Sequence, residues 1–263
     1  MERKIVVSIS NDTEGISQYQ AIKAIKDAGF ENVFIQWYNK DWEISQSEQL
    51  RYAKELGLKV NSAHLGYDNI NSIWSEDLEG DELIDYYRKD FDACISNGIS
   101  LVYMHLTKSK LVGPISEIAL LRAREIVAIA KEKWIRIAFE NTRRQEYNDY
   151  ILSNIQDEHV GICFDIGHCH SNSDGEFNFE LYKDRFFDVH LHDNDKSSDQ
   201  HLLPFDGTVD WEKGIRNLRS INYQGNVTME LCYRRPYLDM DPVDFYKKGL
   251  EIGHKLVAML EKQ

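Results

Sequence analysis

Short apolar segments alternate along the chain with longer segments in which apolar residues recur every three or four positions. Each short segment is rich in Val, Ile, Leu or Phe and is bounded by polar or turn-forming residues. Such runs are typical of parallel strands that are buried on both faces. Strands are predicted at residues 4–10, 31–37, 59–65, 100–106, 135–141, 160–166, 187–193 and 226–232.

The segments between these strands carry helical patterns. Residues 17–29, for example, place apolar residues at helical spacing and end in Gly29, which is a helix stop signal. The segments before the sixth and seventh strands are shorter and more polar, so their helices are less clearly defined. Helices are predicted with the most regular patterns at residues 17–29, 47–57, 82–98, 116–133, 210–225 and 241–262.

A strand followed by a helix, repeated eight times in 263 residues, predicts an α/β protein with the (β/α)8 TIM barrel fold. The alternative is a doubly wound open sheet. Against it, no GxGxxG turn follows the first strand, and the alternation is not interrupted. No linker rich in Pro, Gly or Ser divides the sequence. We therefore expect a single domain that covers residues 1–263.

The composition is that of a soluble globular protein, with 42% hydrophobic and 29% charged residues. The four cysteines show no CxxC spacing, which indicates reduced thiols and a cytoplasmic protein. The apolar runs are too short for a membrane span or a signal peptide, so no membrane partner is expected. The net charge of −13 argues against nucleic acid as a partner, because binding it requires Lys and Arg to neutralise phosphates. The oligomeric state stays open, and a homo-oligomer is one possibility.

Titratable side chains gather where six consecutive predicted strands end, which is the end of a barrel that carries the active site. Carboxylates inside apolar runs such as IAFEN and TMELC are costly to bury unless they are paired or bound to a metal. Several converging carboxylates also repel one another unless a cation neutralises them. The pattern predicts a metal site, and the alternative is a polar network that closes the barrel mouth. The residues are His64, His105, Glu140, Asp165, His168, His190, His192 and Glu230, with Asp199 and His201 in the loop after the seventh strand.

A mixture of His and carboxylate ligands suits a divalent metal, with Zn²⁺ or Mn²⁺ favoured and Co²⁺, Mg²⁺ or Fe²⁺ as alternatives. His190 and His192 share one face of the predicted strand, so parity alone does not separate their roles. We expect His192 to lie one step closer to solvent, where it supports a ligand or contacts the substrate.

Several stretches resemble motifs of the xylose isomerase-like TIM barrel superfamily, which includes sugar and sugar-phosphate isomerases and epimerases and the endonuclease IV group. The resemblance covers essentially the whole chain. Each stretch is a weak signal alone, but their order on successive strands is specific. They are FENT (139–142), FDIGH (164–168), VHLHDN (189–194), DQH (199–201), DGTVDW (206–211) and MEL (229–231).

The resemblance to the epimerase branch implies one metal held by Glu140, Asp165, His190 and Glu230. It also implies that Glu140 and Glu230 act as paired acid and base, and that His168 contacts the substrate. The implied function is a metal-dependent isomerase or epimerase that moves a proton next to a carbonyl of a sugar or sugar phosphate. Such a proton can be removed only if the developing enediolate is stabilised.

The resemblance leaves other functions open. In the endonuclease IV branch nine residues hold three zinc ions, and this chain offers counterparts for the additional ligands at His64, His105, His168, Asp199 and His201. However, His105 is followed by Leu106–Thr107 where that branch has Pro-Gly, and the chain is acidic. A noncatalytic sugar-binding barrel, or a lyase or dehydratase on the same scaffold, is a further alternative. Arg143 and Arg234 could bind a phosphate or carboxylate of the ligand.

Overall fold

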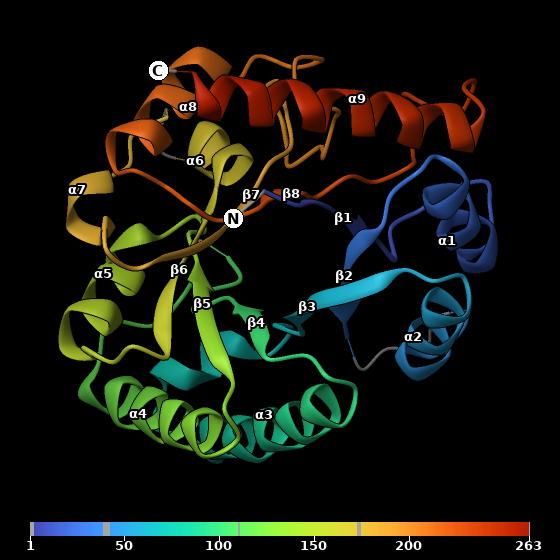
Figure 1. Cartoon of the computed structure of the whole chain (residues 1–263). Coiled ribbons are helices and arrows are strands. Elements are labelled where there is room, and N and C mark those ends of the chain that lie inside the picture. Colours follow the sequence, from blue (N-terminus) through green and yellow to red (C-terminus); the bar gives the residue numbers. More distant parts are fainter. Residues whose placement is uncertain (1–2, 39–42, 110, 173–174, 263) are drawn as a thin grey trace.

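The computed structural model describes residues 3–38, 43–109, 111–172 and 175–262 (Figure 1). Within this part of the chain, eight parallel strands form one sheet in the order β7-β6-β5-β4-β3-β2-β1-β8. Leu191, directly after β7, pairs with Met229 of β8, so the two outermost strands meet and nearly close the barrel. The strands are β1 (Ile5–Ile9), β2 (Asn32–Trp37), β3 (Lys59–Leu65), β4 (Leu101–Met104), β5 (Arg136–Glu140), β6 (Val160–Asp165), β7 (Phe186–His190) and β8 (Val227–Met229).

Helices connect successive strands and surround the barrel (Figure 1). This arrangement confirms the predicted (β/α)8 TIM barrel, and the six regular helix patterns all correspond to helices of the structure. The helices are α1 (Gln18–Asp27), α2 (Gln46–Glu55), α3 (Leu78–Ser96), α4 (Glu117–Glu132), α5 (Gln145–Asn154), α6 (Ile166–Asn172), α7 (Phe179–Tyr182), α8 (Trp211–Ser220) and α9 (Pro242–Glu261), with the 3₁₀ helix η1 (Ile70–Trp74).

Local sequence signals explain where α1 begins and ends. The Ser17 side chain accepts a hydrogen bond from the Gln20 amide, and the Gln20 side chain bonds back to the Ser17 amide, which forms a capping box. After the helix, Gly29 has a φ of 101°, a left-handed conformation that costs little only for glycine. The chain can therefore turn directly into β2.

The inside of the barrel is filled by apolar side chains below the ends of the strands. Val6, Phe34, Tyr103, Ala138 and Cys163 form a buried cluster that is separate from the two larger clusters. Those larger clusters consist mainly of residues from the strands and the surrounding helices. The interior cluster makes an apolar floor for whatever lies at the barrel mouth.

Two findings bear on the environment of the protein. No helix in the described residues combines the length and the apolar character needed to cross a lipid bilayer. All four cysteines are buried, and none of them forms a disulfide bond.

Candidate metal centre

Four of the predicted ligands converge at the carboxyl ends of the last four strands. Glu140, Asp165 and His190 are the final residues of β5, β6 and β7, and Glu230 directly follows β8. Asp165 and His190 are register partners across the β6–β7 pair. One ligand atom from each of the four side chains lies within 4.8 Å of those of the other three, and all four residues are buried. The sequence prediction that these residues meet at one point is thus realised in the structure.

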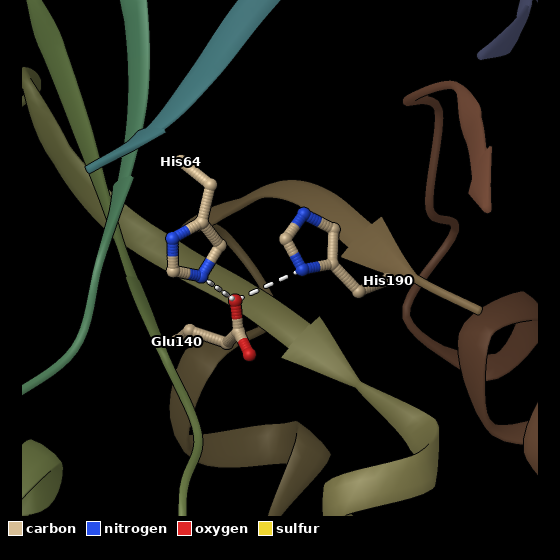
Figure 2. A group of neighbouring side chains, drawn as sticks. All are labelled: His64, Glu140 and His190. Atoms are coloured by element: carbon tan, nitrogen blue, oxygen red, sulfur yellow. Dashed lines mark ion pairs between the residues drawn. The ribbon is translucent and has the colours of Figure 1, made fainter. Parts of the chain in front are cut away.

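Figure 2 shows the Glu140 carboxylate between the rings of His64 and His190. Its Oε2 atom is 2.9 Å from His190 Nδ1 and 3.2 Å from His64 Nε2. Its Oε1 atom is 3.0 Å from His168 Nδ1 and 3.3 Å from His105 Nε2. Burial alone would raise the pKa of Glu140, but His190 and His105 outweigh it and hold the pKa well below its usual value. Glu140 is therefore a buried anion in a ring of histidines.

His190 lies on the apolar floor, and the nearby carboxylates favour the positively charged form of its ring. Its ring stacks on Phe34 with centroids 5.1 Å apart and meets Tyr103 edge-on at 4.4 Å. Burial lowers its pKa, but Glu140 and Glu230 raise it more, to about 9. A metal would need the neutral ring, so binding at this position would release a proton.

Unpaired buried atoms show that the group fits a cation. His190 Nδ1 and Nε2 and Glu140 Oε2 make no hydrogen bond with the described residues, although Nδ1 and Oε2 are 2.9 Å apart. Buried polar atoms are normally hydrogen-bonded, so such a set calls for an explanation. Converging nitrogen and carboxylate donors are the ligands that Zn²⁺ and Mn²⁺ accept.

His192 is fully buried, and the expectation that it lies closer to solvent is wrong. The chain after β7 stays inside the mouth, because Leu191 pairs with Met229 and Asp193 pairs with Leu202. His192 Nε2 is 3.1 Å from Asp165 Oδ2, so the ring hydrogen-bonds to that carboxylate and orients it. Gly167 makes room for it, since a Cβ atom there would lie 2.0 Å from His192 Cε1.

The loop after β7 returns Asp199 and His201 to the mouth, as the sequence predicted. Asp199 Oδ2 is 3.1 Å from His168 Nε2 and 3.3 Å from His201 Nε2. The His201 ring stacks on His192, with centroids 4.1 Å apart and the planes at 10°. Burial opposes the effect, but the nearby histidines His201 and His168 hold the pKa of Asp199 well below its usual value.

Asp193 anchors this loop. Its carboxylate accepts hydrogen bonds from the Phe205 amide at 2.9 Å, the Val209 amide at 3.0 Å and Trp211 Nε1 at 2.7 Å. Gly207 packs against the same carboxylate, where a Cβ atom would lie 2.3 Å from Asp193 Oδ1. The DGTVDW stretch therefore holds the loop rather than reaching the metal ligands.

A cavity of about 200 Å³ opens above these side chains. His64 and His105 form one side of it, with their Nε2 atoms 3.2 Å apart and with Tyr67 stacked on the His105 ring at 4.1 Å. Its wall consists of Asp12, Gln36, Tyr38, His64, Tyr67, Asp68, His105, Lys108, Glu140, His168, Asp199, His201 and Glu230.

The two arginines that the sequence offered as ligand contacts lie in different settings. Arg234 donates hydrogen bonds to the carbonyls of Asp199 at 3.1 Å and Gln200 at 3.0 Å, so it holds the returning loop. Arg143 is exposed at the rim and donates to the Lys108 carbonyl at 3.2 Å.

Sequence reasoning missed two buried polar residues. Gln36 of β2 donates to Glu230 Oε1 at 3.4 Å and accepts from the Asn11 amide at 2.9 Å. Asp188 of β7 lies below His190 and accepts hydrogen bonds from Tyr103 at 2.8 Å and Thr228 at 2.8 Å. Both are polar residues inside apolar strands, which is the signal that could have identified them.

Comparison with known proteins places this geometry in a family. Residues 22–256 match the family described as xylose isomerase-like TIM barrel. The chain belongs to this family. Among curated relatives, uncharacterized protein y4fM of Sinorhizobium fredii is 28% identical over 52% of this chain and 45% of its own length. Uncharacterized protein MJ1311 of Methanocaldococcus jannaschii is 30% identical over 52% of this chain and 50% of its own. The matches thus span about half the length of these relatives.

Solved structures of the xylose isomerase-like fold resemble nearly the whole chain. The IOLI protein with a bound zinc atom has a TM-score of 0.77 and 16% identity, over 99% of this chain and 100% of that chain. D-allulose 3-epimerase from Methylomonas sp. in complex with D-allulose has a TM-score of 0.73 and 19% identity, over 97% and 98% of the two chains. L-ribulose 3-epimerase has a TM-score of 0.76 and 14% identity, over 99% and 96%. At these identities the similarity concerns the fold.

Proposed function

We propose that this protein is a divalent-metal-dependent isomerase or epimerase that acts on a sugar or sugar phosphate. The observation that carries the proposal is the buried group formed by Glu140, Asp165, His190 and Glu230, whose ligand atoms lie within 4.8 Å of one another. A zinc atom in the similarly folded IOLI protein and D-allulose in a similarly folded epimerase support the metal and the substrate class. Zn²⁺ or Mn²⁺ suits the donor set best.

In this mechanism the two glutamates share the proton transfer. Glu140 ends β5 and Glu230 directly follows β8, and β6 and β7 separate these two strands in the nearly closed barrel. One carboxylate removes the proton from the carbon next to the carbonyl, and the other returns it. When bound, the metal supplies a Lewis acid that polarises the carbonyl and the adjacent hydroxyl.

His168 and His192 have supporting roles in the proposal. Burial lowers the pKa of His168, but Asp165 and Asp199 raise it well above its usual value. Its Nδ1 atom lies 3.0 Å from Glu140 Oε1 and its Nε2 atom 3.1 Å from Asp199 Oδ2, so it contacts the substrate by donating from Nε2 to a substrate oxygen that takes the place of Asp199. His192 orients the Asp165 carboxylate through the 3.1 Å contact of its Nε2 atom.

Deuterium exchange tests the proposal directly. The metal-loaded protein is incubated in D₂O with a panel of ketoses and ketose phosphates, and exchange at the carbon next to the carbonyl is followed by NMR. Glu140→Gln and Glu230→Gln should each lower kcat by at least about 10²–10⁴-fold, since each removes a proton-transfer group. Glu132→Gln, an exposed change on α4, is the matched control. Near-native kcat in either site variant would contradict the two-glutamate mechanism.

A second candidate function is supported by the additional histidines. His64 and His105 lie 3.2 and 3.3 Å from the two oxygens of Glu140, and His168, Asp199 and His201 form another group beside them. These residues could hold two further ions, as in an endonuclease IV-type phosphodiesterase. Elemental analysis that gives three metals per chain, together with nicking of abasic DNA, would favour the nuclease over the isomerase. The net charge of −13 opposes it.

A further inference from the structure

A second cavity, of about 190 Å³, opens beside the candidate metal centre. The residues that line both cavities are Tyr67, His105, Lys108, His168 and Asp199. The residues that line only the second cavity are Thr107, Thr142, Arg143 and Asn172. A ligand placed on the metal ligands could therefore extend past His105 and His168 into this space.

The part of the wall that belongs only to the second cavity presents hydrogen-bond donors. Arg143 makes one hydrogen bond, to the Lys108 carbonyl, and has no carboxylate within 4 Å among the described residues. The next residue, Arg144, instead pairs with Glu146 at 2.6 Å. The hydroxyls of Thr107 and Thr142 are 2.7 Å apart, and one hydrogen suffices for that bond. The second hydroxyl hydrogen can therefore be donated to a ligand.

The acidic groups near this wall already have cationic partners. Lys108 Nζ lies 2.5 Å from Asp68 Oδ1. Asp199, which also lines the cavity, lies 3.1 Å from His168 Nε2 and 3.3 Å from His201 Nε2. The Arg143 guanidinium is thus the cation of this wall with no acidic partner among the described residues, in a chain whose net charge is −13.

We propose that this cavity binds an anionic group, a phosphate ester or a carboxylate, at the end of the substrate remote from the metal ligands. The proposal rests on the isomerase function proposed above and adds the substrate class. A guanidinium presents a planar fork of donors that matches both anions, and charge-assisted hydrogen bonds of this kind are roughly twice as strong as neutral ones. Arg143 is then the residue that selects charged over neutral sugars.

Three probes with a common ketose end test the proposal. D-fructose, D-fructose 6-phosphate and D-fructuronate differ only at C6, which carries a hydroxyl in the first, carries a phosphate ester in the second and is the carboxylate carbon in the third. Isothermal titration of the metal-loaded protein should show at least one charged probe binding about tenfold or more tightly than D-fructose. Preference for one charged probe identifies the anion as phosphate or carboxylate.

Two charge-matched variants separate the subsite from general electrostatics. Arg143→Gln should weaken the charged probe about tenfold or more and change D-fructose binding less than about twofold, whereas Arg144→Gln should change neither appreciably. Equal affinity for charged and neutral probes, or equal effects of the two variants, would overturn the subsite. Deuterium exchange with D-fructose, combined with no preference for the charged probes, would contradict only the anion-binding subsite. Charge-selective binding that depends on Arg143, without deuterium exchange in any probe, would contradict the isomerase function and support the subsite.

Discussion

At the scale of single residues, two histidines on the same strand face have different environments. His190 Nδ1 lies 2.9 Å from Glu140 Oε2 and 3.5 Å from Glu230 Oε2, and neither ring nitrogen makes a hydrogen bond with the described residues. His192 instead contacts Asp165 and stacks on His201. Strand parity makes both rings face the mouth, but only His190 belongs to the group of four converging ligands. The two residues should therefore differ in what their loss does to the metal.

We predict that His190→Ala loses the metal far more severely than His192→Ala. The first change removes a ligand, whereas the second removes only the group that orients Asp165 and should weaken binding by about 10–100-fold. Titration of each purified variant with Zn²⁺ or Mn²⁺ measures the difference, with His159→Ala at the opposite end of the barrel as the control. Equal losses, or a greater loss in the His192 variant, would show that the ligand role is assigned to the wrong histidine.

The sequence predicted the members of this site better than their surroundings. The ends of parallel strands must meet at the barrel mouth, so the sequence places Glu140, Asp165, His190 and Glu230 together with the other titratable residues there, and the family resemblance selects these four as ligands. The burial of His192 could not be predicted from the sequence, because it depends on the space left by Gly167, a residue of another element. A side chain's exposure is decided by such tertiary contacts, whereas its strand face is decided by alternation.

At the scale of elements, a buried carboxylate joins α3 to the end of β2. Asp90 of α3 is 3% exposed, and its Oδ1 atom accepts a hydrogen bond from Trp37 Nε1 at 3.2 Å. Burial raises the pKa of Asp90 to about 7, against the lowering effect of Trp37 and Tyr86. The packing of this helix on the barrel should thus depend on pH near neutrality.

We predict that Asp90→Asn removes part of the pH dependence of stability. With a folded-state pKa near 7 and an unfolded value near 3.8, the folded protein holds the proton more tightly. Wild-type stability is therefore lost as the pH rises from about 4 to about 7, by up to about 4 kcal/mol for this group. Urea unfolding from pH 4 to pH 8 should show that the free energy of unfolding of Asp90→Asn increases relative to that of the wild type as the pH rises.

Asp92→Asn is the control for this experiment, because Asp92 is 62% exposed on the same helix. The difference in unfolding free energy between Asp90→Asn and the wild type should change with pH more than the difference between Asp92→Asn and the wild type. A difference for Asp90→Asn that stays constant over this range would mean that Asp90 is ionised in the folded protein.

Element boundaries were the least predictable part of the fold. The helix α3 begins at Leu78, four residues before the predicted start, because the Asp77 side chain accepts a hydrogen bond from the Gly80 amide and caps it. The connection between β6 and β7 contains the short helices α6 and α7, whose polar sequences gave only a weak pattern. Caps and short helices depend on single side chains, so periodicity over a long window does not detect them.

At the scale of the whole molecule, the candidate metal centre lies at the open end of a barrel that has its own core. The interior cluster of Val6, Phe34, Tyr103, Ala138 and Cys163 fills the barrel, and the two larger clusters connect the strands to the helices. These contacts explain why composition and periodicity alone predicted the architecture. They also mean that the fold does not depend on the metal ligands for its hydrophobic core.

We predict that chelation abolishes activity without unfolding the protein. Dialysis against EDTA should leave the far-UV circular dichroism unchanged and the thermal transition cooperative. Loss of a ligand that binds only the folded state lowers stability by RT ln(1 + [L]/Kd), which is about 4 kcal/mol at a thousandfold excess over Kd. In a chain of this size that corresponds to a fall in Tm of about 8–16 °C.

Activity should return when Zn²⁺ or Mn²⁺ is added back, and untreated protein carried through the same dialysis without EDTA is the control. Cooperative unfolding at room temperature on chelation would instead assign the metal a structural role, because the barrel core would then be insufficient without it.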